Sequence, residues 1–155
     1  MPNKKIKNAT QINSNGIKFK SILESTIYRR LLEYGFKPEY EKHKYVIWTG
    51  YRPTVPFYCT NPSTNAIALN NKKLIDITYT PDFVFQHNNY TIIIEVKGFR
   101  NDVFRYKLKL FRKYLEMSEK NVIFAEIKTR RQLEAFIQIL FTEYGEGNLE
   151  SGKEF

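Results

Sequence analysis

The chain has little cysteine and histidine, with one Cys and two His among 155 residues. Cys59 cannot form an internal disulfide and has no metal-ligating residue nearby, which fits a reducing compartment. No apolar run approaches the roughly 20 residues of a membrane-spanning helix, and the basic, polar N-terminus lacks the apolar segment of a secretory signal. We therefore expect a cytoplasmic protein with no membrane partner.

Internal repeats and low-complexity tracts are also absent, while 42% hydrophobic and 15% aromatic residues are enough for a packed core. This length favours one domain, residues 1–155. We expect flexible ends at 1–15 and 145–155. Three prolines among Asn, Ser and Thr predict that 50–66 is an inserted loop.

Basic residues outnumber acidic ones by 25 to 16, and the net charge of +9 favours a polyanionic partner. Most of the excess lies in residues 97–131, which hold eleven basic and four acidic side chains. Such a run can be a solvated helix surface, but its position directly after an acidic motif favours phosphate contacts. The side chains that we predict to contact DNA are Arg100, Arg105, Lys109, Arg112, Lys113, Arg130 and Arg131.

Hydrophobic periodicity and capping signals predict three helices, at 17–34, 101–116 and 129–144. Apolar and β-branched runs predict strands at 39–48 and 121–127, a hairpin at 79–98, and a further strand or hairpin arm within 67–77. The strand–helix–strand order over 90–127 predicts a parallel pair with a right-handed crossover. The expected fold class is α/β.

The hairpin at 79–98 carries the candidate catalytic residues. Asp82 follows a proline at the start of its first strand, and a polar Asn-rich break at 86–89 is typical of a turn. Antiparallel pairing then brings Asp82 beside Glu95, near the end of the second strand. Because strand side chains alternate, Glu95 and Lys97 share a face and Val96 points away.

Two unpaired carboxylates this close would repel each other and raise a pKa. A divalent cation between Asp82 and Glu95 removes that conflict, and hard oxygen ligands suit Mg²⁺ or Mn²⁺. Lys97 would then lie beside the metal-bound water or the scissile phosphate. The alternative is an edge strand with solvated charges.

A third acid, Glu24, lies in the first predicted helix. At 100° per residue it falls near Leu31, on the margin of the apolar stripe. There it would point toward the sheet edge, although an exposed helical glutamate is the alternative. We expect Glu24 to join Asp82 and Glu95 in the metal site.

Four short segments follow one another along the chain: Leu23-Glu24, Gly-Phe-Lys-Pro-Glu-Tyr-Glu (35–41), Tyr-Thr-Pro-Asp-Phe (79–83) and Ile-Glu-Val-Lys-Gly (94–98). In the order of these motifs the chain resembles the PD-(D/E)XK nuclease superfamily and, within it, the phage endonuclease I family of Holliday junction resolvases. The resemblance spans about residues 16–128.

The resemblance implies a restriction-endonuclease-like fold, a mixed β-sheet flanked by α-helices. Glu24, Asp82, Glu95 and the Val96 carbonyl would hold Mg²⁺ or Mn²⁺, and Lys97 would orient or activate the attacking water. It further implies a homodimer that cuts four-way junctions, in the host cytoplasm if the protein is phage-encoded, with active sites drawing on both chains by strand exchange. The alternatives are a nuclease of this superfamily with another substrate, in replication, recombination or restriction, and a non-catalytic DNA-binding protein.

Overall fold

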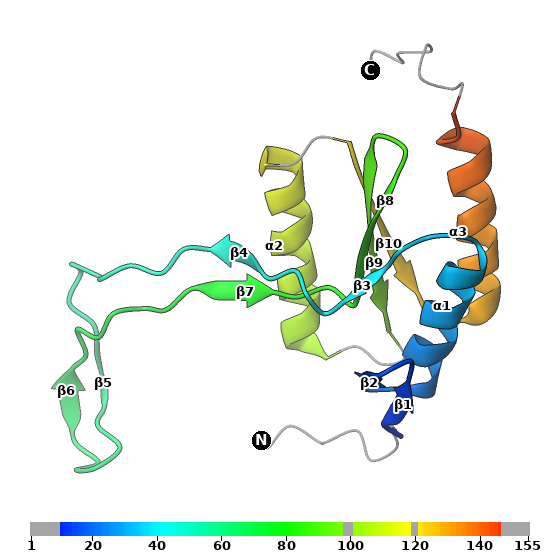
Figure 1. Ribbon diagram of the computed structural model, residues 1–155. Coiled ribbons are helices and arrows are strands. Elements are labelled where there is room, and N and C mark those ends of the chain that lie inside the picture. The colour runs from blue at the N-terminus through cyan, green and yellow to red at the C-terminus, as the bar shows by residue number, and fades with distance from the viewer. Residues whose placement is uncertain (1–9, 98–100, 119–120, 147–155) are drawn as a thin grey trace.

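The computed structural model describes residues 10–97, 101–118 and 121–146 (Figure 1). Its centre is a four-stranded sheet in the order β10-β9-β8-β3. These strands are β3 (Glu39–Tyr40), β8 (Phe83–His87), β9 (Tyr90–Val96) and β10 (Val122–Ile127). β10 runs parallel to β9 and the other two pairs are antiparallel, so the sheet is mixed, and the predicted parallel pair is confirmed.

Helices cover both faces of this sheet. Helix α2 (Asp102–Ser118) lies on one face, and α1 (Ile22–Glu33) and α3 (Arg130–Glu143) lie on the other (Figure 1). The three predicted helices are therefore present, and the α/β class is confirmed. Among the described residues, no helix is long and apolar enough to cross a membrane.

Strand β9 forms the middle of the core because both of its faces are covered. Ile92 and Ile94 pack in the apolar cluster that includes Ile27 of α1 and Leu133 of α3. Ile93, between them, packs in the cluster that includes Phe111 of α2. A strand buried on both faces has a continuous apolar run rather than an alternating one, as here.

The predicted hairpin is confirmed, with a two-residue turn at Asn88 and Asn89 between β8 and β9. Asn88 has a φ of 52°, a left-handed conformation that asparagine tolerates well. The register pairs Phe83 with Ile94. One step further along both strands, Asp82 comes opposite Glu95, as expected from the sequence.

The N-terminal segment differs from the prediction. Strands β1 (Ile12–Ser14) and β2 (Ile17–Phe19) form a small hairpin where we expected the end of a flexible arm and the start of a helix. The cause is the Asn15-Gly16 turn, where both residues have positive φ, a strong hairpin signal. Helix α1 begins only after Ser21, whose hydroxyl accepts a hydrogen bond from the Glu24 amide.

The strand expected at 39–48 is broken in two. Its first part is β3, and its second part is β4 (Tyr45–Trp48), which pairs with β7 (Ile77–Tyr79) in a separate sheet. Glu41 lies at the break with a φ of 48°, a conformation that ends an extended strand.

Residues 49–76, which we call the arm, extend away from the body of the protein (Figure 1). The expected inserted loop at 50–66 contains one short strand, β5 (Tyr58–Thr60), which pairs with β6 (Ile67–Leu69). Prolines flank β5, but its own residues favour a strand. The strand expected within 67–77 is confirmed as β6.

Candidate active site

Three acids are buried at one end of the central sheet. Among the described residues, the only charged side chains that are buried are those of Glu24, Asp82 and Glu95, with exposed fractions of 8%, 8% and 4%. Charged groups are rarely buried unless they are paired or bind an ion, because desolvation disfavours the charged form. The cost of burying the three predicted metal ligands must therefore be offset by hydrogen bonds, ion pairs or a bound cation.

Asp82 lies just before β8, opposite Glu95 of β9. Its Oδ2 accepts a hydrogen bond of 2.6 Å from the Val96 amide. Burial, together with the charge of Glu95, raises the pKa of Asp82 to about 8. The repulsion expected from the sequence is present in the structure.

Glu95 is held from both sides. The Tyr79 hydroxyl donates to its Oε2 at 2.8 Å, and the Lys97 ammonium lies 3.2 Å from its Oε1. Burial raises the pKa of Glu95, although both contacts favour the ionised form. Lys97 also lies 4.4 Å above the Phe104 ring, a cation–π contact that fixes its direction. Glu95 and Lys97 therefore share the α2 face, as predicted.

Glu24 comes from the first turn of α1 and has three donors. Its Oε1 accepts from the Ser21 hydroxyl at 3.0 Å, and its Oε2 accepts from the Lys20 amide at 3.1 Å and the Tyr40 hydroxyl at 2.5 Å. With the Ser21 cap, this arrangement resembles a capping box, which is a structural role. Its charge also contributes to the raised pKa of Asp82. Glu24 is therefore buried beside the other acids rather than exposed on the helix.

The donor set fits a divalent cation in its chemistry. Asp82 and Glu95 supply carboxylate oxygens that hard cations prefer, and a cation would relieve the repulsion that raises the pKa of Asp82. The side chains are not gathered for coordination as they stand, since no three His, Cys, Asp or Glu in the described part of the chain could hold a metal ion together. Glu24 would have to exchange present hydrogen bonds to become a ligand.

Sequence reasoning missed four residues around the acids. Glu126 of β10 is in register with Glu95, and its charge contributes to raising the pKa of that carboxyl. Burial and Glu95 raise the pKa of Tyr79, while burial and Glu24 raise the pKa of Tyr40. Lys20 lies near the acids as well: burial lowers its pKa, but the carboxylates of Glu41, Asp82 and Glu24 outweigh that effect and raise it. The predicted parallel pairing placed Glu126 on the strand beside Glu95 without fixing its register, and Tyr40 and Tyr79 lie in the segments 35–41 and 79–83 without a signal for these contacts.

The predicted DNA-contacting residues are on the surface where the structure describes them. Exposed side chains include Arg105, Lys109, Arg112, Lys113, Arg130 and Arg131, whereas Arg100 lies outside the described residues. A groove of about 440 Å³ along α2 is lined by Asp102, Arg105, Tyr106, Leu108, Lys109 and Arg112. The predicted positions are therefore accessible to a large anionic partner.

Comparison with known proteins gives a family but no activity. No curated protein matches the chain. A family model described as "Protein of unknown function (DUF1064)" matches residues 4–130, a range that contains Glu24, Asp82, Glu95 and Lys97. Since that match covers most of the sequence, the protein belongs to the DUF1064 family.

Proposed function

We propose that this protein is a metal-dependent DNA endonuclease that hydrolyses phosphodiester bonds, with a restriction-endonuclease-like fold of the PD-(D/E)XK type. The observation that carries the proposal is the burial of Glu24, Asp82 and Glu95 at one end of the sheet, with Lys97 adjacent. Burying carboxylates costs stability that apolar residues would not cost. A functional role at this position accounts for that cost.

Each residue has a proposed task. Glu24, Asp82, Glu95 and the Val96 carbonyl would hold Mg²⁺ or Mn²⁺, which when bound supplies a water of lowered pKa and polarises the phosphoryl oxygens. Lys97 places positive charge where the transition state gains negative charge. The Glu95 carboxylate and the Phe104 ring keep its ammonium in place before substrate binds.

The surroundings of the acids favour an anionic substrate. All three helices begin at the end of the sheet where β9 ends and run away from it (Figure 1). Their N-termini carry partial positive charge, which favours phosphate. Exposed basic residues on α2 and at the start of α3 would contact flanking phosphates. Such contacts carry little base information, so selectivity would come from DNA shape.

For the substrate, we propose branched DNA, in particular the four-way junction, cut by a homodimer. The arm favours a protein contact, because apolar side chains of the arm are exposed in the single chain: Val55, Phe57, Tyr58, Ile67, Leu69, Leu74 and Ile75. Residues 53–71 contain no charged side chain, in a chain of net charge +9. Two such chains repel least where they carry no charge, so the arm is the surface that a second copy would use.

A substrate panel tests this function. A four-way junction, a flap, a single strand and a linear duplex are incubated at equal salt with Mg²⁺ or with EDTA. We expect cleavage only with Mg²⁺, fastest on the junction. Equal rates on junction and linear duplex would exclude a resolvase and leave another nuclease of this type. DNA binding without cleavage of any substrate would instead support the non-catalytic alternative.

A further inference from the structure

Lys20 lies between β2 and α1, beside the buried acids. Its backbone amide donates to Glu24 Oε2 at 3.1 Å and to the Tyr40 hydroxyl at 3.2 Å, so its backbone is tied to the site. Its ammonium forms an ion pair with Glu41, and its side chain is 65% exposed. The charges of Asp82 and Glu24 also act on this ammonium. Lys20 is thus a solvent-accessible cation within electrostatic range of two of the three acids.

Glu41 fixes where this cation lies relative to Asp82. Its backbone amide donates to the Asp82 carbonyl at 2.9 Å, while its carboxylate pairs with Lys20. It does so with a φ of 48°, a conformation that is costly for a residue with a side chain and that occurs often at functional sites. One strained residue therefore links the backbone of a catalytic candidate to the lysine.

Lys20 and Lys97 lie on different sides of β8. Lys97 follows β9, one neighbour of β8, and Lys20 is paired to the residue after β3, the other neighbour. An isolated exposed ion pair contributes little stability, so stabilising the fold is a weak reason for this arrangement. An ammonium that can exchange a carboxylate for a phosphate oxygen is well suited to bind substrate.

We propose that Lys20 is a second phosphate-binding residue of the site, positioned by Glu41, and that it contacts the substrate backbone on the β3 side of the acids. This role rests on the proposed nuclease function. Glu41 acts through Lys20 as a positioning residue: it holds the ammonium near Asp82 in the free protein and releases it to the phosphate when DNA binds.

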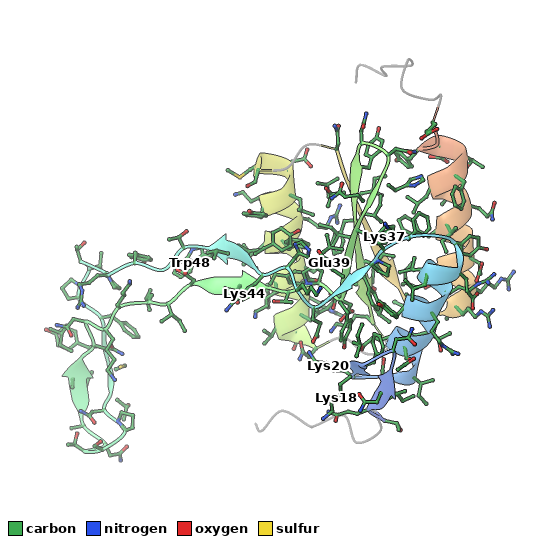
Figure 2. All side chains as sticks on the ribbon, viewed as in Figure 1. Lys18, Lys20, Lys37, Glu39, Lys44 and Trp48 are labelled. Atoms are coloured by element: carbon green, nitrogen blue, oxygen red, sulfur yellow. The ribbon has the colours of Figure 1, made fainter. Side chains whose placement is uncertain are left out.

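The test compares Lys20→Ala with Lys18→Ala. Lys18 is an exposed lysine within β2, two residues before Lys20 on the same part of the body (Figure 2), and both substitutions remove one positive charge. We expect Lys20→Ala to lower kcat/KM by about 10- to 100-fold on the substrate that the wild type cuts fastest. With Ca²⁺ replacing Mg²⁺, we measure how the DNA-binding constant falls as the salt concentration rises. In a plot of log K against log salt concentration, we expect the slope for Lys20→Ala to be smaller by about 1, which corresponds to the loss of one phosphate contact. Lys18→Ala should stay within about twofold of the wild type in both measurements.

Glu41→Gln separates substrate binding from a structural ion pair. If Lys20 binds phosphate, this variant keeps the cation, so DNA affinity and its salt dependence are retained. We expect kcat to fall, because Glu41 no longer positions the Lys20 ammonium. Equal losses of DNA affinity in Glu41→Gln and Lys20→Ala would show a structural pair and overturn the proposal. Cleavage by Lys20→Ala at the rate of Lys18→Ala would overturn this role alone. No Mg²⁺-dependent cleavage by the wild type would overturn the nuclease function and this role with it.

Discussion

The acid-bearing end of the sheet and the arm both depart from the usual distribution, in which charged side chains are exposed and apolar side chains are buried. At the sheet end, Glu24, Asp82 and Glu95 are buried. On the arm, apolar residues such as Val55, at 78% exposed, lie in solvent. Folding alone would favour the reverse in both regions. Both regions therefore lower the stability of the fold, which is typical of surfaces that bind a substrate or a partner protein.

The two regions differ in how they are supported. The acids lie on the body, between α2 and the other two helices, where packing holds them in a fixed register. Strands β5 and β6 pair only with each other in a two-stranded sheet, and such ribbons are marginal on their own. We therefore expect changes at the acids to affect chemistry in a protein that stays folded, and changes on the arm to affect association.

The largest expected effect is at Asp82. Asp82→Asn keeps an oxygen that can accept from the Val96 amide but removes the charge, so we expect cleavage to fall by about 10³-fold or more. Initial rates on the best substrate measure this. The matched control is Glu143→Gln, an exposed acid at the far end of α3, which should cleave like the wild type. Wild-type rates in Asp82→Asn would remove Asp82 from the site.

The next effect separates two roles of Glu24. Glu24→Gln still accepts hydrogen bonds from the Lys20 amide and the Tyr40 hydroxyl, so α1 keeps its cap. We expect the thermal midpoint to change by only about 2 °C, which corresponds to roughly 0.5–1 kcal/mol, while cleavage falls by roughly 100-fold. Loss of stability without loss of cleavage would show that Glu24 is only a helix cap.

A smaller effect is the pH dependence of stability. The pKa of Asp82 is raised from 3.8 to about 8 by burial and the charge of Glu95, so between these pH values the unfolded state is ionised while the folded state keeps its proton. The free energy of unfolding therefore falls as the pH rises through this range. Asp82→Asn removes that dependence and should be more stable than the wild type by roughly 1–3 kcal/mol near pH 8.

Urea unfolding in EDTA measures this difference. Near pH 4 the two proteins should have similar free energies of unfolding, because Asp82 is then protonated in the folded protein. A stability difference that is the same at both pH values would mean that the buried carboxyl is compensated already, and that it does not need a cation.

The smallest effect on stability is expected from the arm. Replacing residues 53–71 by a short Gly-Ser turn should change the free energy of unfolding of the body by less than about 1 kcal/mol, because β5 and β6 pair only with each other. Light scattering should at the same time show a dimer for the full chain and a monomer for the shortened one. A truncated protein that still dimerises would place the contact elsewhere.

The sequence predicted the part of the site that depends on local rules. Turn chemistry and strand alternation were enough to pair Asp82 with Glu95 and to give Glu95 and Lys97 one face. The Asn15-Gly16 turn carried a signal just as strong, but the apolar periodicity from Phe19 onward favoured a longer helix.

The missed contacts depend on tertiary structure. Glu126 comes beside Glu95 only through the register of β10 against β9, which a parallel pairing alone does not fix. Tyr79 reaches Glu95 from β7, which pairs with β4 outside the central sheet. The Lys20–Glu41 pair joins residues 21 positions apart across a break in a strand. No local spacing rule indicates contacts of these kinds.

Calorimetric titration with Mn²⁺ tests most directly whether the buried acids bind a divalent cation. We expect saturable binding to the wild type and to Glu143→Gln, and its loss in Asp82→Asn and in Glu95→Gln. No binding to the wild type, or equal binding to all four proteins, would contradict the assignment of these carboxylates to a metal site.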